Sequence, residues 1–245
     1  MKTIGLLGGM SWESTTIYYR LLNQHVKERL GGLHSAKCLL YSFDFEEVQR
    51  LQHQGQWEEA GDLLARTARL LEGAGADFLV ICTNTMHKVA EQIQQEVSLP
   101  LLHIADATAE RIRKNGLGKV GLLATGFTME QDFYKGRLHQ KYGLDVLVPE
   151  PRDREVVHQI IYQELCRGVI KPDSRQRYRE IISRLVEQGA EAIILGCTEI
   201  TLLVNQDDSP VPLFDTTAIH AEAAVDWALA VDAPPAHRAN PATSA

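Results

Sequence analysis

Cys197 is the residue in this sequence best placed to carry out chemistry. It follows the apolar run Ala192 to Leu195, and Thr198 and Glu199 come directly after it. Such a run predicts a buried strand, and the polar residues after it predict a turn that opens a helix. A thiol at a helix N-terminus is expected to ionise more readily than a free thiol, because unpaired amides and the helix dipole stabilise the thiolate. The alternative is a buried structural cysteine.

An internal duplication supports a functional role for this cysteine. Residues 75–84 parallel residues 189–198 at an offset of 114, so Thr83 is the counterpart of Cys197. Two further matches follow the same order at nearly the same offset: 5–8 with 121–124, and 100–103 with 212–215. Copies of more than 100 residues lie outside the short-repeat architectures, so the pattern indicates two copies of one α/β unit.

The elements that must position Thr83 and Cys197 follow from the apolar runs. These runs predict strands at 3–7, 36–43, 78–82, 100–104, 119–123, 144–148, 192–195 and 211–214. Strands that alternate with helices predict parallel sheets. We therefore expect two similar parallel-sheet α/β domains, related by internal duplication and a pseudo-two-fold axis, with the active site between them. The predicted first domain is 1–103 plus 215–231, the second is 104–214, and 232–245 is a disordered tail.

The predicted positions of Thr83 and Cys197 suit one kind of reaction. Ligands of parallel sheets bind beyond the carboxyl ends of the strands, and both residues follow a strand. If the two copies face each other, the two side chains approach one substrate from opposite sides. That geometry fits a 1,1-proton transfer, in which one group removes a proton from a carbon and another returns it on the opposite face. A thiol suits this work because its pKa lies near working pH.

Composition excludes several other classes of protein. The chain has 245 residues and a formal net charge of −7, so it lacks the basic footprint of a protein that binds nucleic acid or an anionic membrane. Its four cysteines lack metal-type spacing, and reduced thiols in a cytoplasmic protein are the simplest interpretation. No apolar run is long enough for a signal peptide or a membrane span. The glycines at 5, 8 and 9 fit neither nucleotide-binding fingerprint, and a turn that brings backbone amides to a carboxylate is favoured.

The motifs, taken together, resemble the aspartate/glutamate racemase superfamily. They are Gly-Gly-Met-Ser at 8–11, Asn-Thr-x-His at 84–87, Leu-Ala-Thr at 123–125 and Gly-Cys-Thr-Glu at 196–199. The resemblance covers about residues 1–231. It implies a cofactor-independent enzyme with no metal and no pyridoxal phosphate, a small amino-acid substrate, and a homodimer.

The first motif departs from the family pattern, because members usually carry a cysteine where this chain has Thr83. Cys82 lies one residue earlier, so strand alternation should turn it away from the site. A hydroxyl is a far weaker acid than a thiol and is a poor base at neutral pH. In the family's two-cysteine members the second cysteine faces the hydrogen of the L-enantiomer. The resemblance therefore implies a racemase of L-aspartate and L-glutamate that favours L to D kinetically, with Cys197 as base and Thr83 acting on the opposite face, directly or through water.

The resemblance also assigns the other site residues. The substrate-binding positions are Met10, Gln52, Asn84, Thr85, Thr125, Lys171 and Thr198. His87 and Glu199 are supporting residues, and Glu199 is expected to orient Cys197 or cap its helix. Cys38 and Cys166 are expected to be structural. The arginine motif of other members is absent from the loop around Gln52, so the preferred substrate side chain stays open.

Three alternatives to an acidic-amino-acid racemase fit the same sequence. The first is a racemase of broad specificity, because the sequence offers no clear cationic side chain to bind a second carboxylate of the substrate. The second is a single-cysteine decarboxylase or an isomerase of the same superfamily. The third is a protein that binds an amino acid without turning it over.

Overall fold

The computed structural model describes residues 1–230 and confirms the predicted fold class, an α/β protein with two parallel four-stranded sheets. The strand order is β2-β1-β3-β4 in the first sheet and β6-β5-β7-β8 in the second, which is the same order twice. The strands are β1 (Ile4–Gly8), β2 (Cys38–Ser42), β3 (Phe78–Ile81), β4 (Leu101–Leu102), β5 (Lys119–Ala124), β6 (Asp145–Leu147), β7 (Ala192–Gly196) and β8 (Leu213–Asp215). The predicted tail at 232–245 lies outside the described residues.

Helices connect these strands. Those of the first half are α1 (Trp12–Leu30), α2 (Phe45–His53), α3 (Trp57–Gly73), the 3₁₀ helix η1 (Thr85–Val89), α4 (Ala90–Glu96) and α5 (Ile104–Lys114). Those of the second half are α6 (Gly126–Glu130), α7 (Asp132–Tyr142), α8 (Pro151–Gln163), η2 (Leu165–Arg167), α9 (Pro172–Glu187), α10 (Ile200–Leu203), η3 (Gln206–Asp208) and α11 (Thr216–Leu229). No helix within residues 1–230 is both long and apolar enough to cross a membrane.

The first sheet is covered on both faces because its strands are apolar on both sides. Leu7, Leu79 and Ile81 point to one face, where they share a core with Leu64 and Ala68 of α3. Ile4, Leu6 and Val80 point to the other face and pack with Tyr18, Leu22 and Val26, which recur every four residues along α1. Burial of each such large side chain stabilises the fold by about 1.5–3 kcal/mol.

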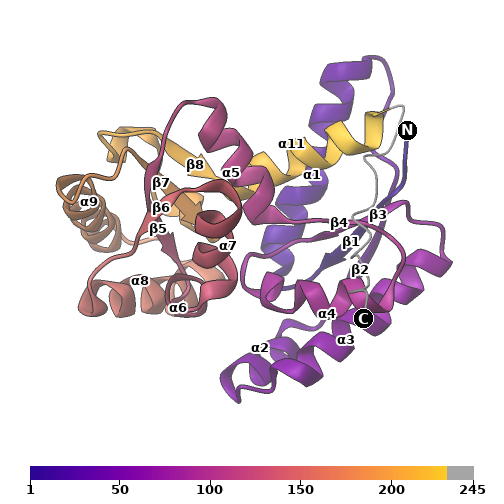
Figure 1. The fold of residues 1–245 in the computed structure, drawn as a ribbon, viewed down its shortest axis with the longest axis horizontal. Helices are drawn as coiled ribbons and strands as arrows, with labels where there is room; N and C mark the ends of the chain where they lie inside the picture. The colour runs from indigo at the N-terminus through magenta and orange to yellow at the C-terminus, as the bar shows by residue number, and fades with distance from the viewer. Residues whose placement is uncertain (231–245) are drawn as a thin grey trace, which may run out of the picture.

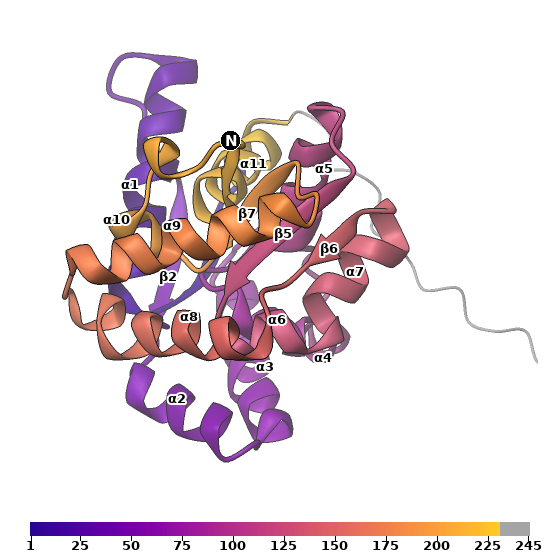
Figure 2. The same ribbon diagram turned by 90° about the vertical axis from the view of Figure 1, so that its left-hand side faces the viewer.

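The chain passes between the two sheets twice, after β4 and after β8. Figure 1 shows the sheets side by side, with α11 in yellow running from the second sheet to the first alongside α1. Ala221, Ala224 and Val225 of α11 belong to the core of the first sheet. The domain boundaries predicted from the sequence stay a prediction, and this packing of α11 supports them. Figure 2 shows α8 and α9 lying over the outer side of the second sheet.

Matching register in the two sheets brings the polar segments together. Leu7 pairs with Ile81 at the end of β1 and β3, and Leu123 pairs with Leu195 at the end of β5 and β7. The turns after these four strands therefore leave their sheets at equivalent points. The helices that follow β3 and β7 are short: a 3₁₀ turn follows Asn84, and α10 has only four residues.

Candidate active site

A pocket lies where the carboxyl ends of the two sheets face each other. It encloses about 400 Å³ of space free of protein atoms, including its open mouth. Nine of the residues predicted from the sequence line it: Met10, Gln52, Thr83, Asn84, Thr85, Thr125, Cys197, Thr198 and Glu199. Six others line it as well: Ser11, Phe45, Ile161, Tyr162, Cys166 and Gly196.

Two residues predicted for the site do not line the pocket. Lys171 precedes α9 with a side chain that is 56% exposed, and its Nζ lies 3.1 Å from Oε1 of Glu164. Its expected position beside the substrate is therefore not observed in this structure, because a carboxylate seven residues away binds the ammonium group at the surface. His87 is buried behind Thr83, where it can support the site without touching a ligand.

Cys197 is partly buried, and its Sγ donates a hydrogen bond to Oε2 of Glu199 over 2.9 Å. Burial, followed by the negative charge of Glu199, raises the pKa of the thiol well above its usual value. The expectation of a readily ionised thiol is therefore wrong, since the pKa of Cys197 is raised. The four-residue α10 begins only at Ile200, so its short dipole is outweighed by burial and by the adjacent carboxylate.

Glu199 is buried, and its second oxygen is bound by the other half of the protein. Ser11 Oγ donates to Oε1 of Glu199 over 2.6 Å, and Ser14 Oγ donates to the same oxygen over 3.1 Å. Both serines lie at the start of α1, where Ser11 is also the N-cap. Nothing local in the sequence indicates that either serine has a partner 185 or more residues away.

The turn that carries Ser11 is formed by Gly8 and Gly9. A Cβ at Gly8 would lie 2.6 Å from Cγ2 of Thr15, and one at Gly9, where φ is 84°, would lie 2.3 Å from the carbonyl oxygen of Phe43. Only glycine fits such close approaches of helix and loop. The turn thus brings the start of α1, and with it Ser11, against the second sheet.

Thr83 faces the pocket from the opposite half. Its hydroxyl makes no hydrogen bond to any other residue in the described part of the chain, whereas its carbonyl accepts one from Nδ1 of His87 over 2.8 Å. Nε2 of His87 accepts from the amide of Ile104, so His87 is the neutral Nδ1–H tautomer. Burial, together with nearby His103 and His220, lowers the pKa of His87 well below its usual value. Cys82 is buried in the core below the pocket, as strand alternation predicts.

Two buried amide oxygens at the pocket, Oε1 of Gln52 and Oδ1 of Asn84, have no partner among the described residues. Their orientation is determined by their neighbours. Asn84 Nδ2 donates over 3.0 Å to the hydroxyl of Thr216, which itself donates to the carbonyl of Leu195. Gln52 Nε2 donates to the sulfur of Met86. A buried acceptor without a donor costs about 1–3 kcal/mol, so both oxygens are suited to receive N–H groups of a ligand.

A cluster of three hydroxyls lies near Asn84. Thr85 Oγ1 is 3.1 Å from Oγ1 of Thr125 and 3.4 Å from Oγ1 of Thr128, and the latter two are 3.3 Å apart. Thr125 is the N-cap of α6 without a capping hydrogen bond from its side chain. Hydroxyl groups that bind only one another can rotate to donate to an anion such as a carboxylate. Thr128 is buried beneath the other two and was not predicted from the sequence.

Charge is distributed unevenly around the pocket. None of its lining residues is lysine or arginine, and Glu199 is its only carboxylate.

Cys166, expected to be structural, also lines the pocket, because η2 brings it beside Cys197. Burial, with Glu199 nearby, raises the pKa of the Cys166 thiol. Within residues 1–230 no group of three or more histidine, cysteine or acidic side chains is arranged to hold a metal ion.

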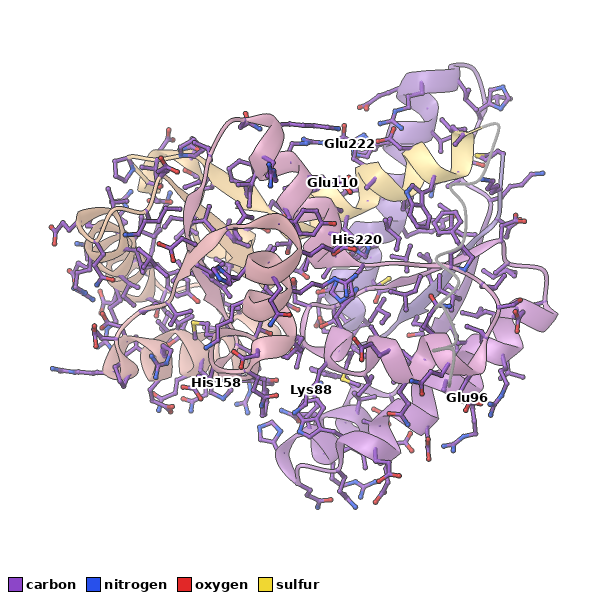
Figure 3. All side chains as sticks on the ribbon, in the orientation of Figure 1. Lys88, Glu96, Glu110, His158, His220 and Glu222 are labelled. Atoms are coloured by element: carbon purple, nitrogen blue, oxygen red, sulfur yellow. The ribbon has the colours of Figure 1, made fainter. Side chains whose placement is uncertain are left out.

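An aromatic bridge joins the two halves next to the pocket. Its rings have centroids 4.8 to 6.2 Å apart, and they belong to His53, Trp57, Phe127, His158 and Tyr162. Figure 3 shows His158 and Lys88 on the same lower side of the molecule, and Nζ of Lys88 lies 3.9 Å above the ring of Trp57. The bridge therefore lies opposite the two chain crossings, where Figure 3 labels His220.

Comparison with known proteins identifies the family. Residues 7–224 match the Asp/Glu/Hydantoin racemase family. The broad specificity amino-acid racemase RacX of Bacillus subtilis is 26% identical over 239 residues, covering 93% of this chain and 98% of RacX. A crystal structure of a candidate Asp/Glu racemase from Yersinia pestis is 59% identical with a TM-score of 0.89, covering 94% of this chain and 100% of that one.

A second solved structure agrees with these matches. An aspartate racemase homologue from Pyrococcus horikoshii is 37% identical with a TM-score of 0.81, covering 93% of this chain and 99% of that chain. The superfamily and the enzyme class predicted from the motifs are thereby confirmed. The chain is an enzyme of the amino-acid racemase type and belongs to the Asp/Glu/Hydantoin racemase family.

Proposed function

We propose that the chain racemises free amino acids by 1,1-proton transfer without a cofactor. One observation carries the proposal: Cys197 and Thr83, at equivalent ends of β7 and β3 in two duplicated sheets, line one pocket. A substrate held between them presents one face of its α-carbon to each. In the L to D direction the Cys197 thiolate removes the α-proton, and Thr83 delivers a proton to the other face, directly or through a water molecule.

The remaining pocket groups divide into donors and acceptors that suit the two ends of an amino acid. The hydroxyl cluster of Thr85 and Thr125 can donate to the α-carboxylate. The unpartnered oxygens of Gln52 and Asn84 can accept from the ammonium group. Such contacts fix the α-carbon between Thr83 and Cys197 and stabilise the negative charge that develops when its proton leaves.

The two enantiomers are expected to be deprotonated at different rates, because Thr83 and Cys197 differ in acidity. A thiol has a reference pKa near 8.5, and an alcohol is far weaker as an acid, so only Cys197 is an effective base. The enantiomer whose hydrogen faces Cys197, which we take to be L, is deprotonated readily, and its mirror image slowly. The equilibrium between enantiomers is unchanged, so the asymmetry concerns rates and saturation.

The pocket favours a substrate with an uncharged side chain over L-aspartate or L-glutamate. A second carboxylate would meet Glu199 and no lysine or arginine among the lining residues, and Lys171 is paired at the surface. Burial of an unpaired charge is costly, whereas a neutral side chain can pack against Phe45, Ile161 and Tyr162. The acidic substrates implied by the motifs are therefore the second candidates.

Proton NMR in deuterium oxide tests the function and the substrate together. The purified chain and a Cys197→Ser control would be given L-serine, L-leucine, L-aspartate, L-glutamate and each D-enantiomer, and loss of the α-hydrogen signal would be followed. We expect exchange of neutral L-amino acids, faster than of their mirror images and absent in the control. Exchange of aspartate or glutamate alone would overturn the substrate assignment and leave the racemase.

The same samples separate the competing activities. Release of carbon dioxide from an arylmalonate, without α-hydrogen exchange on any amino acid, would identify a decarboxylase. Saturable binding of an amino acid by calorimetry, with no exchange in days, would identify a binding protein. Either result would refute the racemase.

A further inference from the structure

The pocket amide of Asn84 is held by two consecutive hydrogen bonds that lie outside the pocket. Its Nδ2 donates to Oγ1 of Thr216 over 3.0 Å, and that hydroxyl donates to the carbonyl oxygen of Leu195 over 2.9 Å. Thr216 is the first residue of α11, is fully buried and does not line the pocket. An amide that follows β3 is thus held from β7 and from the chain crossing after β8.

The direction of these bonds is determined by the single proton of the Thr216 hydroxyl. A hydroxyl donates one hydrogen bond, and this one goes to the carbonyl of Leu195. Toward Asn84 the hydroxyl oxygen can therefore only accept, so the amide must present its NH₂ group there. In a flipped amide, either two acceptors would face each other or Leu195 would lose its donor. Buried polar groups without partners are costly, so the observed orientation is favoured.

This orientation leaves Oδ1 of Asn84 at the pocket with no partner among the described residues. The side chain has no capping role either, because Asn84 is the N-cap of η1 without a capping hydrogen bond from its side chain. An amide oxygen only accepts, so the ligand atom beside it must carry a proton. An α-ammonium group meets this requirement, whereas the carbonyl of a 2-oxo acid would set one acceptor against another.

A second pocket amide is turned the same way by a different neighbour. Gln52 Nε2 donates over 3.0 Å to the sulfur of Met86, which is fully buried and does not line the pocket. A thioether has no proton to donate, so Oε1 of Gln52 is again left unpartnered among the described residues. Because a thioether is a weak acceptor, Met86 holds its amide less firmly than Thr216 does.

The bond from Thr216 to Asn84 has no equivalent in the other copy of the duplicated fold. The duplication makes Ile104 the counterpart of Thr216, and Ile104 has no hydroxyl. It makes Thr198 the counterpart of Asn84, so the amide is missing as well. Within the described residues, the pocket therefore presents an amide held in this way from one side only.

We propose that Thr216 is a positioning residue that fixes the polarity of Asn84 and thereby selects ligands that donate a hydrogen bond there, namely amino acids over the matching 2-oxo acids. The inference rests on the proposed function and deepens it. Thr216 acts through Asn84 and does not touch the substrate. Because it also ties the amide to β7, the α-carbon keeps one orientation between Thr83 and Cys197.

The test compares two ligands that differ only at the α-position, L-leucine and 4-methyl-2-oxopentanoate. Calorimetry gives the Kd of each for the wild-type chain, Thr216→Val and Thr216→Ser. Valine keeps the shape of threonine but removes the hydroxyl, so Asn84 is free to turn its NH₂ group to the pocket. Serine keeps the hydroxyl and is the matched control. Thermal unfolding checks each fold, and Thr216→Ala carries the same expectations if Thr216→Val does not fold.

We expect the wild-type chain to bind L-leucine at least about tenfold more tightly than the 2-oxo acid. In Thr216→Val this ratio should fall by about tenfold, because the amino acid loses its acceptor and the flipped amide can donate to the oxo group. Thr216→Ser should restore most of the ratio. In α-hydrogen exchange of L-leucine, Thr216→Val should raise KM by about tenfold and change kcat much less, because the amide holds the ammonium group before and during proton transfer.

The ratio of the two Kd values separates a positioning role from a structural one, since damage to the pocket weakens both ligands alike. An unchanged ratio in Thr216→Val, or failure of Thr216→Ser to restore it, would overturn the inference. Equal affinity of the wild-type chain for both ligands, including no binding of either, would do the same. If the wild-type chain binds L-leucine but exchanges no α-hydrogen on any amino acid, the proposed function fails, while the binding ratios still test Thr216.

Discussion

The ends of β3 and β7 occupy equivalent places in two copies of one fold, yet they are equipped differently. Behind Cys197 lies a buried carboxylate that contacts the thiol. Behind Thr83 lie three buried histidines, of which His87 binds the backbone carbonyl and leaves the hydroxyl without a partner in the described chain. The first arrangement contacts the thiol that we propose as the base, whereas the second contacts the backbone of Thr83. A duplicated scaffold can thus keep its geometry while its two equivalent strand ends carry different side chains.

The largest effect is expected from Cys197→Ser. The substitution replaces the proposed base with a hydroxyl, so that both strand ends then carry a hydroxyl. Exchange of L-amino acids should fall by about 10³-fold or more, with little change in stability. Proton NMR in deuterium oxide measures the rate, and thermal unfolding checks the fold. A loss of less than tenfold would mean that Cys197 is not the base.

Thr83→Cys should make the two halves alike by giving both strand ends a thiol. A thiol at this position supplies a base for the enantiomer that Cys197 cannot reach, so exchange of the D-amino acid should rise by about 10²-fold. Thr83→Ser, which keeps the hydroxyl, is the matched control and should leave the D-directed rate low. Equal rates in both variants would show that the hydroxyl does not limit the reverse reaction.

The Thr83 half should also be more sensitive to acid. Burial lowers the pKa of His220 to about 4 from 6.5, and the pKa values of His87 and His103 are lowered in the same direction. Below pH 6.5 the unfolded chain takes up protons that the folded chain excludes, so stability falls with pH. His220 alone should cost on the order of 2 kcal/mol at pH 5 relative to pH 8.

Urea unfolding between pH 8 and 5 measures this loss. His220 Nε2 donates to the carbonyl of Leu102, and Nδ1 accepts from the hydroxyl of Tyr18, so His220→Gln keeps a donor and an acceptor without the titration. We expect a flatter pH dependence in this variant, even if it is less stable at pH 8. Identical pH dependence in both proteins would exclude His220 as a source of acid sensitivity.

The smallest effect is expected from Lys171→Ala. Its Nζ pairs with Glu164 at the surface, and neither residue lines the pocket, so exchange rates should stay within about twofold. The sharpest check is to measure KM for L-glutamate in both the wild-type chain and the variant. A selective rise in KM for acidic substrates would show that Lys171 moves to the substrate carboxylate, as the motifs imply.

The sequence predicts what local periodicity and internal duplication control. Helix α1 spans Trp12–Leu30 because its apolar positions recur every four residues, and Thr83 rather than Cys82 faces the pocket because strand residues alternate. It does not predict contacts that the fold makes between distant segments. Ser14 reaches Glu199 across 185 positions, and Cys166 enters the pocket only because η2 folds against α10. The predicted direction of the pKa shift at Cys197 is wrong, because the shift depends on burial of the thiol and then on the charge of Glu199, which the fold determines.

The return of α11 to the first sheet has a consequence for synthesis of the chain. Strands β1 and β3 leave the ribosome early, but the alanines and Val225 that cover one of their faces lie at 221–228. The core of the first sheet is therefore completed after the second sheet has been synthesised, so its apolar face stays uncovered until residues 221–228 emerge. A nascent chain stalled before Ala221 would present that face to chaperones, and a truncation at the same point would leave it open to aggregation.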